Sequence, residues 1–292
     1  MYKILVTGAA GLLGNKIVKL HSEDYTIIGA YNKNKPDFKN SVQLDILKKR
    51  QFSIIEKIKP DIIIHTAGIT NVDYCEDHRE DAWKINVEGT KNIIDISKKI
   101  GSKIIFISTD YIFDGKNGPY QEEDEPNPIN WYGKTKLEAE KLVESSNLEY
   151  IITRTTVLYG LDKYKLNFVT WIINELKNGR KIRVVTDQYG TPTLADNMAE
   201  ILLQLILKDK QGIYNVVGSD LINRYQFALE IEKFFNLTEG LIIPIKTDEL
   251  NQKAPRPKKG GLKVNKIKSE LNINPLGIKD GLLIIKKQMT IK

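Results

Sequence analysis

A tyrosine and a lysine four residues apart form the strongest chemical signal in the sequence. The stretch Tyr132-Gly133-Lys134-Thr135-Lys136 has a helical pattern, so Tyr132 and Lys136 share one helix face. An ammonium group beside a phenol lowers the phenol pKa, which allows Tyr132 to act as a general acid towards a ketone. Taken alone, such a pair is also an ordinary interaction on a helix surface.

Thr109 strengthens the catalytic interpretation. It lies in Ser108-Thr109-Asp110, at the end of an apolar run that predicts a strand upstream of Tyr132. A threonine hydroxyl at this position can hold the carbonyl oxygen that Tyr132 protonates. The three residue types in this order predict a site that adds or removes hydrogen at a carbonyl carbon.

A glycine-rich turn follows the first apolar run and precedes a helical pattern. It reads Gly8-Ala9-Ala10-Gly11-Leu12-Leu13-Gly14. Gly8 permits a tight exit from the strand, Gly11 lets backbone amides approach a diphosphate, and the third glycine lets the helix pack closely on the sheet. We therefore expect a dinucleotide at Gly8, Gly11, Leu12 and Leu13, although an ordinary strand-to-helix turn would also use glycines.

The segment after the second strand bears on the choice of cofactor. It contains Asn32, Lys33 and Lys35, and no acid before Asp37. A carboxylate here would accept a hydrogen bond from the ribose 2′-hydroxyl of NAD, whereas lysines and amides suit the 2′-phosphate of NADP. We expect NADP, with NAD possible, and Lys136 can also hold the nicotinamide ribose. The plainer alternative is that the lysines are surface residues.

Short apolar runs predict the fold. They are continuous rather than alternating, which is typical of strands buried on both faces of a parallel sheet. The runs are residues 4–6, 26–28, 62–64, 104–107 and 150–152, with helical patterns near 12–21, 47–58, 80–100 and 131–145. This order predicts an α/β fold with a doubly wound parallel sheet of the Rossmann type.

The second half of the chain predicts a smaller α/β unit that binds substrate. Helical patterns occur near 167–178, 194–207 and 224–235, with a strand near 181–185 and a loop over 253–261. We expect a cofactor-binding domain over 1–160, which also receives roughly 186–217, and a cap formed mainly by 161–292. A ligand should lie between them, at the carboxyl ends of the strands.

Composition excludes several classes of protein. The 292 residues, 41% hydrophobic and 28% charged, indicate a globular protein of one or two domains. The single cysteine, Cys75, excludes an internal disulfide and suggests a reducing compartment. No apolar run is long enough for a membrane span, and the N-terminus lacks the zones of a signal peptide. We expect a cytoplasmic protein that binds no membrane.

The net charge of +7 does not indicate nucleic-acid binding. Basic residues are interleaved with acids along most of the chain and are not accompanied by aromatic residues. The excess fits a lysine-rich surface or an anionic small ligand.

Several stretches resemble a known family. The spacing G-x-x-G-x-x-G, with Thr109, Tyr132 and Lys136, is similar to the extended short-chain dehydrogenase/reductases. Within that family, 108–115, 130–136, 187–193 and Arg256-Pro257 resemble the dTDP-4-dehydrorhamnose reductase branch. The resemblance implies NADPH-dependent reduction of a 4-keto-6-deoxy nucleotide-sugar to dTDP-L-rhamnose, with those three residues catalytic.

The resemblance also implies further binding residues. On the cofactor side it places Asp45 near the adenine amino group, with Ile46, and the small residues Thr66, Ala67 and Gly68 along the backbone of the cofactor. On the substrate side it implies Asp110, Tyr111, Gln188, Thr191 and Arg256. A loop arginine suits a diphosphate because its guanidinium donates in a fork geometry. Plainer interpretations stay open for these residues: Asp45 as a helix cap, the residues around Gln188 as a turn, and Arg256 as a solvated loop arginine.

Departures from the family pattern leave alternatives open. Some members dimerise through a magnesium site that uses a glutamate just after the glycine turn. This chain has Asn15-Lys16 there, and the lysine repels a cation, so we expect no such metal. A homodimer is possible. The motif at 154–159 lacks a tryptophan found in the reductases. Together with 115–120 and 254–257, it looks like the regulatory β subunit of methionine adenosyltransferase. A non-catalytic NADP-binding subunit is therefore one alternative, and another nucleotide-sugar reductase or epimerase is a second.

Overall fold

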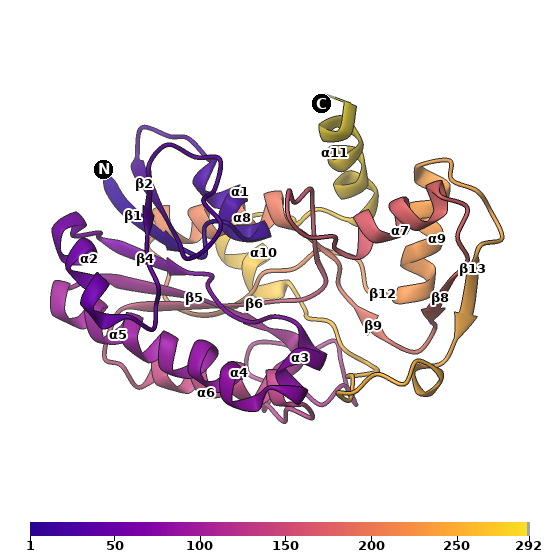
Figure 1. Ribbon diagram of the computed structural model, residues 1–292, viewed down its shortest axis with the longest axis horizontal. Helices are drawn as coiled ribbons and strands as arrows, with labels where there is room; N and C mark the ends of the chain where they lie inside the picture. Colours follow the sequence, from indigo (N-terminus) through magenta and orange to yellow (C-terminus); the bar gives the residue numbers. More distant parts are fainter. Residues whose placement is uncertain (291–292) are drawn as a thin grey trace.

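Seven parallel strands form the central sheet of the protein (Figure 1). A computed structural model of the chain describes residues 1–290. The strand order is β3-β2-β1-β4-β5-β6-β11, so the direction of winding reverses between β1 and β4. Ligands of doubly wound sheets bind at this reversal, beyond the carboxyl ends of the strands. The strands are Tyr2–Thr7 (β1), Tyr25–Tyr31 (β2), Ser41–Gln43 (β3), Ile62–His65 (β4), Lys103–Thr109 (β5), Tyr150–Thr155 (β6) and Gly212–Asn215 (β11).

Helices cover both faces of the sheet. One face carries α1 (Leu12–Val18), α8 (Ala195–Leu207) and α10 (Asn265–Leu271), and the other carries α2 (Ser53–Ile58), α5 (Gly89–Ile100) and α6 (Trp131–Glu144) (Figure 1). Successive residues of β1 therefore enter different cores: Ile4 and Val6 pack with α1 and α8, while Leu5 packs with α2, α5 and α6. This double burial explains why the strand sequence is apolar without alternation.

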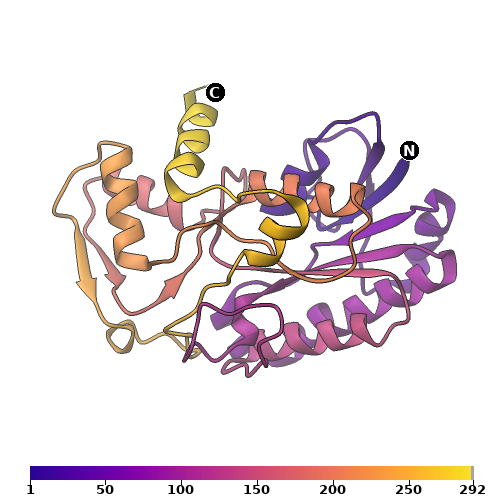
Figure 2. The same cartoon turned by 180° about the vertical axis from the view of Figure 1, so that it is seen from behind.

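A smaller unit lies at one end of the sheet and has its own apolar core. Figure 2 shows its helices and a separate strand pair beyond the end of the main sheet. Its elements are α7 (Phe168–Lys177), α9 (Arg224–Phe234), α11 (Ile278–Thr290) and the parallel pair β8 (Ile182–Val185) and β13 (Ile242–Ile245). Two-residue strands form the pairs β7 (Leu158–Tyr159) with β10 (Thr193–Leu194) and β9 (Tyr189–Gly190) with β12 (Ile222–Asn223).

The fold class and the five strands expected from apolar runs are confirmed, and several elements were not predicted. β3 has three residues and β11 reads Gly-Ile-Tyr-Asn, so neither shows an apolar run; both lie at the edges of the sheet, where less burial is required. The region expected as one helix over 80–100 is α4 (Arg79–Trp83), a π-helical stretch over Lys84–Glu88 and α5, with α3 (Val72–Asp77) before them. β13, α10 and α11 were also missed. None of the helices within residues 1–290 has the length and apolar character that crossing a membrane requires.

A buried ion pair joins α6 to the sheet. Arg154 of β6 donates from Nε and Nη2 to the two carboxylate oxygens of Glu140 on α6, at 3.2 and 2.9 Å, and from Nη1 to the Glu122 carbonyl at 2.8 Å. The two side chains are 4% and 1% exposed. A charge removed from water in this way depends on its partner.

Glu140→Gln should lower the free energy of unfolding by about 3 kcal/mol, because the Arg154 charge then stays buried without a counter-ion. Urea denaturation of the variant and the parent measures the difference. The matched control is Glu138→Gln on the same helix, whose 3.9 Å pair with Lys141 is exposed and whose loss should change little. Equal stability of Glu140→Gln and Glu138→Gln would contradict the role of the buried pair.

Candidate active site

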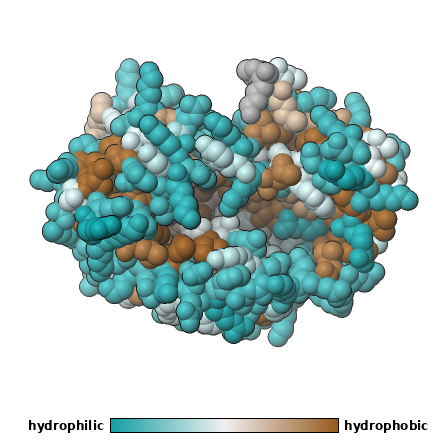
Figure 3. All heavy atoms as spheres, in the orientation of Figure 1, coloured by the Kyte–Doolittle hydropathy of each residue, from teal (hydrophilic) through white to brown (hydrophobic). Residues whose placement is uncertain are grey.

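A cavity of about 570 Å³ opens at the carboxyl ends of the strands. The glycine turn, the ends of β4, β5 and β6, the first turn of α6, residues 162–167 and the first residue of α9 line it. The space-filling view shows a hollow in the middle of this face within a largely polar surface (Figure 3). The cavity lies between the main sheet and the smaller unit, where a ligand was expected from the sequence.

The glycine turn leaves no room for side chains. Gly8 has φ of +71°, and a Cβ there would lie 2.8 Å from the Ala67 backbone nitrogen. A Cβ on Gly14 would collide with the Gly8 carbonyl. Leu12 and Leu13 begin α1 and line the cavity, and the amides of the first turn of a helix have no partner within the helix. This backbone can hold an anion such as a cofactor diphosphate.

The three predicted catalytic residues meet at the cavity. Asn130 caps α6 by accepting a hydrogen bond from the Gly133 amide at 2.8 Å, which starts the helix at the end of β5. Tyr132, Lys136 and Thr109 are all buried and all line the cavity. The Thr109 hydroxyl lies near that of Tyr132 and acts on its pKa. A carbonyl oxygen beside these two hydroxyls can therefore receive hydrogen bonds from both.

Burial controls the protonation of the site. It raises the pKa of Tyr132, and Thr109 acts in the opposite direction without overcoming it. Desolvation therefore raises the pKa of Tyr132, which we expected Lys136 to lower, and the opposing effect comes from Thr109. Burial also lowers the pKa of Lys136 to about 7. Its Nζ donates to the Ile107 carbonyl at 2.6 Å and lies 3.9 Å from the Phe106 ring centroid.

Asn86 supports the catalytic helix and was not found from the sequence. It lies in the π-helical stretch before α5, an irregularity that often marks functional positions. Its amide donates to Thr135 Oγ1 at 3.1 Å, and Thr135 donates to the Tyr132 carbonyl at 2.8 Å. The same side chain accepts from the Ile69 amide and donates to the Ile69 carbonyl. Asn86 thus holds the cavity loop and the helix of Tyr132 together.

His65 is a second buried polar residue that the sequence did not reveal. Its Nδ1 lies 2.7 Å from Thr7 Oγ1 at the end of β1, and its Nε2 lies 3.1 Å from Thr90 Oγ1 on α5. Burial, and then the charge of Lys136, lower its pKa to about 3, so the ring is neutral at pH 7. His65 therefore fixes neighbouring strand and helix ends rather than supplying charge.

The predicted cofactor residues divide into two groups. Gly11, Leu12, Leu13, Thr66 and Gly68 line the cavity. The others do not line it: Gly8, Asn32, Lys33, Asp45, Ile46 and Ala67.

Two of the residues outside the cavity lining were predicted to contact the adenosine end of the cofactor. Lys33 is exposed in the turn after β2, next to Asn34, which does line the cavity. Asp45 accepts a hydrogen bond from the Leu47 amide at 3.0 Å and pairs with Lys48 at 3.5 Å. These contacts match the capping role that the sequence left open for Asp45. Contact of either residue with a cofactor remains a prediction.

The predicted substrate residues also divide. Asp110 and Tyr111 line the cavity, whereas Gln188, Thr191 and Arg256 do not. Gln188 donates to Thr247 and Gln252, and Thr191 accepts from the Leu262 amide, so both hold loops of the smaller unit. Roles in substrate binding stay predictions for these three.

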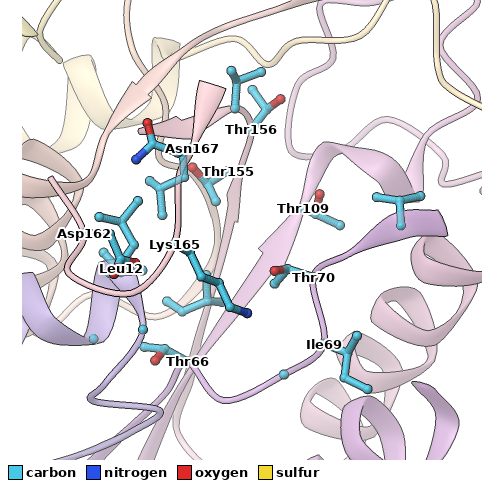
Figure 4. Close-up of a pocket in the computed structure, with 18 of the residues that line it drawn as sticks. Leu12, Thr66, Ile69, Thr70, Thr109, Thr155, Thr156, Asp162, Lys165 and Asn167 are labelled. Carbon is cyan, nitrogen blue, oxygen red and sulfur yellow. The ribbon is translucent and has the colours of Figure 1, made fainter. Parts of the chain in front are cut away.

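Residues 162–167 form a wall of the cavity that the sequence did not predict. Figure 4 shows Lys165 reaching into the space between Thr66 and Thr70. The segment is tied to the turn after β2, because the Tyr164 hydroxyl donates to the Lys35 carbonyl at 3.2 Å. Its sequence contains no pattern that predicts this contact, since Lys35 lies far from Tyr164 along the chain.

Lys16 holds the position at which related proteins were expected to place a metal ligand. Its Nζ lies 3.0 Å from Asp196 Oδ1 and 3.2 Å from Gln288 Oε1, and the Gln288 amide donates to Asp196 at 2.8 Å. The ammonium group neutralises the carboxylate that a cation would need. This arrangement supports the prediction that no metal binds here.

Comparison with known proteins identifies the family. Residues 2–290 match the model of the RmlD substrate binding domain. The chain belongs to the RmlD family. It is 35% identical over 289 residues to dTDP-4-dehydrorhamnose reductase of Aggregatibacter actinomycetemcomitans, covering 94% of this chain and 95% of the relative. The family assignment confirms the resemblance to extended short-chain dehydrogenase/reductases of the dTDP-4-dehydrorhamnose reductase type.

Two further relatives define the alternatives within the RmlD family. Methionine adenosyltransferase 2 subunit beta of Bos taurus is 33% identical over 294 residues, which covers 96% of this chain and 87% of that protein. The crystal structure of dTDP-4-dehydrorhamnose reductase from Bacillus anthracis in complex with NADP superposes with a TM-score of 0.89. It is 32% identical, with 98% and 99% of the two chains covered.

The titration of Lys136 tests the electrostatics of the site. Since burial penalises the charged form, the ammonium should lose its proton as the pH rises through about 7. Carbon NMR of enzyme with labelled lysine ε-carbons should show one signal that titrates there and is missing from Lys136→Met. A spectrum with no lysine signal that titrates near pH 7 and disappears in Lys136→Met would contradict the burial effect.

Proposed function

We propose that the protein is an NADPH-dependent reductase of a 4-keto-6-deoxy nucleotide-sugar that converts dTDP-4-dehydrorhamnose to dTDP-L-rhamnose. The observation that carries the proposal is the meeting of Thr109, Tyr132 and Lys136 in one cavity with the glycine turn. Relatives that are named dTDP-4-dehydrorhamnose reductase and match nearly the whole chain support the choice of substrate.

The residues of the chain fit a dinucleotide. The crowded Gly8 and the free amides of the first turn of α1 suit a diphosphate, and Lys136 lies where a ribose hydroxyl can accept from it. When bound, NADPH supplies the hydride that reduces the keto carbon. Lys33 and Lys35 suit the 2′-phosphate because they carry positive charge in an exposed turn.

The protonation states suit reduction. Tyr132 holds its proton over the physiological range because burial raises its pKa, so it can donate to the oxygen as the carbonyl becomes an alcohol. Thr109 holds the same oxygen in line with Tyr132. A charged Lys136 beside the ribose stabilises the negative charge that passes to Tyr132, which then regains a proton from solvent.

A non-catalytic regulatory subunit is the second candidate function. The 33% identity to methionine adenosyltransferase 2 subunit beta favours it, and such a subunit would also bind NADP through the glycine turn. The two candidates differ in turnover: a regulatory subunit binds the dinucleotide and a methionine adenosyltransferase without oxidising NADPH in the presence of a keto-sugar. The open cavity beside the catalytic residues favours the reductase.

The setting of the proposed reaction follows from the same features. We place the enzyme in the cytoplasm, where the buried Cys75 stays reduced, and a homodimer is compatible with this function. Its partner is the nucleotide-diphosphate sugar, with no role for nucleic acid or a membrane.

Tyr132→Phe tests the reaction and the role of the proton donor. The wild-type protein should oxidise NADPH when given dTDP-4-dehydrorhamnose, and the variant should be slower by about 100- to 10,000-fold because the donor is gone. Absorbance of the nicotinamide measures both rates. Tyr2→Phe, at an exposed tyrosine outside the cavity, is the control. A wild-type protein that binds NADPH and methionine adenosyltransferase but turns over no keto-sugar would establish the regulatory candidate.

Cofactor choice is tested at the turn after β2. Changing Lys33 and Lys35 together to Asp should reduce the preference for NADPH over NADH by about tenfold or more, because two carboxylates repel the 2′-phosphate. Fluorescence titration with each dinucleotide gives the ratio. The same change at Lys98 and Lys99 on α5 controls for net charge. An unchanged ratio would show that other residues select the cofactor.

A further inference from the structure

Arg224 is a cation without an acidic partner at the substrate end of the cavity. It is the first residue of α9 and lines the cavity. Within residues 1–290, no carboxylate oxygen lies within 4.0 Å of its guanidinium nitrogens. A cation at the start of a helix is also opposed by the helix dipole. Two unfavourable features at one lining residue indicate that a ligand compensates for them.

The surroundings hold Arg224 in a defined orientation. Its guanidinium carbon lies 5.1 Å from the Phe168 ring centroid, and the Tyr111 side chain lies near enough to act on its pKa. Burial lowers the pKa of Arg224, while Tyr111 and Asp110 act in the opposite direction and Arg256 adds to the lowering. An anion would therefore be attracted to this end of the cavity.

Arg256 is less able to serve this anion. Its Nη2 pairs with Asp73 at 2.9 Å, and its Nη1 donates to the Ala254 carbonyl at 2.8 Å. Both ends of its fork are thus occupied, and it does not line the cavity. Of the two arginines beside Tyr111, Arg224 is the one that faces the cavity with its charge uncompensated.

The position of Arg224 separates its ligand from the cofactor diphosphate. The glycine turn precedes α1 on the main sheet, whereas α9 belongs to the smaller unit on the other side of the molecule (Figure 1). Tyr111 is a neighbour of both Arg224 and Tyr132. Its ring centroid lies 5.8 Å from that of Tyr132, and its side chain acts on the pKa of Arg224. A sugar lying over Tyr111 can thus present its keto carbon to Tyr132 and the group on its anomeric carbon to Arg224.

We infer that Arg224 is the residue that binds the diphosphate of the nucleotide-sugar, and that it positions the sugar across Tyr111 for reduction at Tyr132. The inference rests on the proposed nucleotide-sugar substrate. A guanidinium suits this role because its planar fork donates two parallel hydrogen bonds to phosphate oxygens. Diphosphate binding is thus assigned to Arg224, whereas the sequence suggested Arg256 for it.

Binding measurements test this inference without turnover. Calorimetry is carried out on the full protein saturated with NADP⁺, with thymidine diphosphate, uridine diphosphate and thymidine as probes. For the diphosphate that the wild-type protein binds, Arg224→Gln should raise Kd by about 10- to 100-fold. Arg224→Lys should have a smaller effect, because it keeps the charge and loses the fork. Affinity for NADP⁺ should stay within about twofold of wild type.

The control is Arg183→Gln, at an arginine that is 53% exposed on β8 and outside the cavity, and it should leave every Kd unchanged. A change of less than twofold in Arg224→Gln, or a wild-type protein that binds neither diphosphate, would overturn the inference. So would a parallel loss of NADP⁺ affinity and melting temperature, which would show a structural role. If diphosphate binding depends on Arg224 but no keto-sugar is reduced, the proposed reaction fails and the assignment of diphosphate binding to Arg224 stands.

Discussion

The site depends on how closely α6 packs against the end of β5. Gly133 makes this packing possible, since a Cβ there would collide with the Tyr111 carbonyl. With the helix in this position, Lys136 reaches the Ile107 carbonyl of β5 at 2.6 Å, and Tyr132 meets Thr109 at the end of the same strand. Asn86 and the buried Arg154–Glu140 pair hold the helix from two other sides. The predicted catalytic residues are therefore placed by main-chain packing and buried polar contacts.

The same close packing excludes water, and this determines the charges. Desolvation acts in opposite directions on two groups of the site: it raises the pKa of Tyr132, which therefore keeps its proton, and it lowers the pKa of Lys136. His65 stays neutral below the site for the same reason. Such a site attracts a ligand that brings negative charge close to Lys136, because the ammonium then gains the partner that the protein does not provide. At the other end of the cavity, the guanidinium of Arg224, which has no carboxylate within 4.0 Å among residues 1–290, also attracts a negatively charged ligand.

Local sequence patterns predicted the sheet, the glycine turn and the catalytic trio because each is encoded over a few consecutive residues. Continuous apolar runs identify strands buried on both faces, and the interval from Tyr132 to Lys136 identifies one helix face. Asn86, His65, Lys165 and Arg224 lie outside such patterns, since their importance comes from neighbours far along the chain. The start of α9 did carry a usable signal: an arginine directly after the capping Asn223 conflicts with the helix dipole. Edge strands β3 and β11 were missed because they need little apolar sequence.

Fold alone does not separate a reductase from a regulatory subunit in this family. Relatives with both kinds of name match this chain at 35% and 33% identity over almost its whole length. The difference must lie where a sugar would meet the catalytic groups. There the chain keeps Thr109 and Tyr132 in contact and leaves the cavity beside them open. It also directs a cation into that cavity at the cost of an unfavourable helix start. A protein that only bound a dinucleotide would not need that cation, because we expect the cofactor diphosphate at the glycine turn.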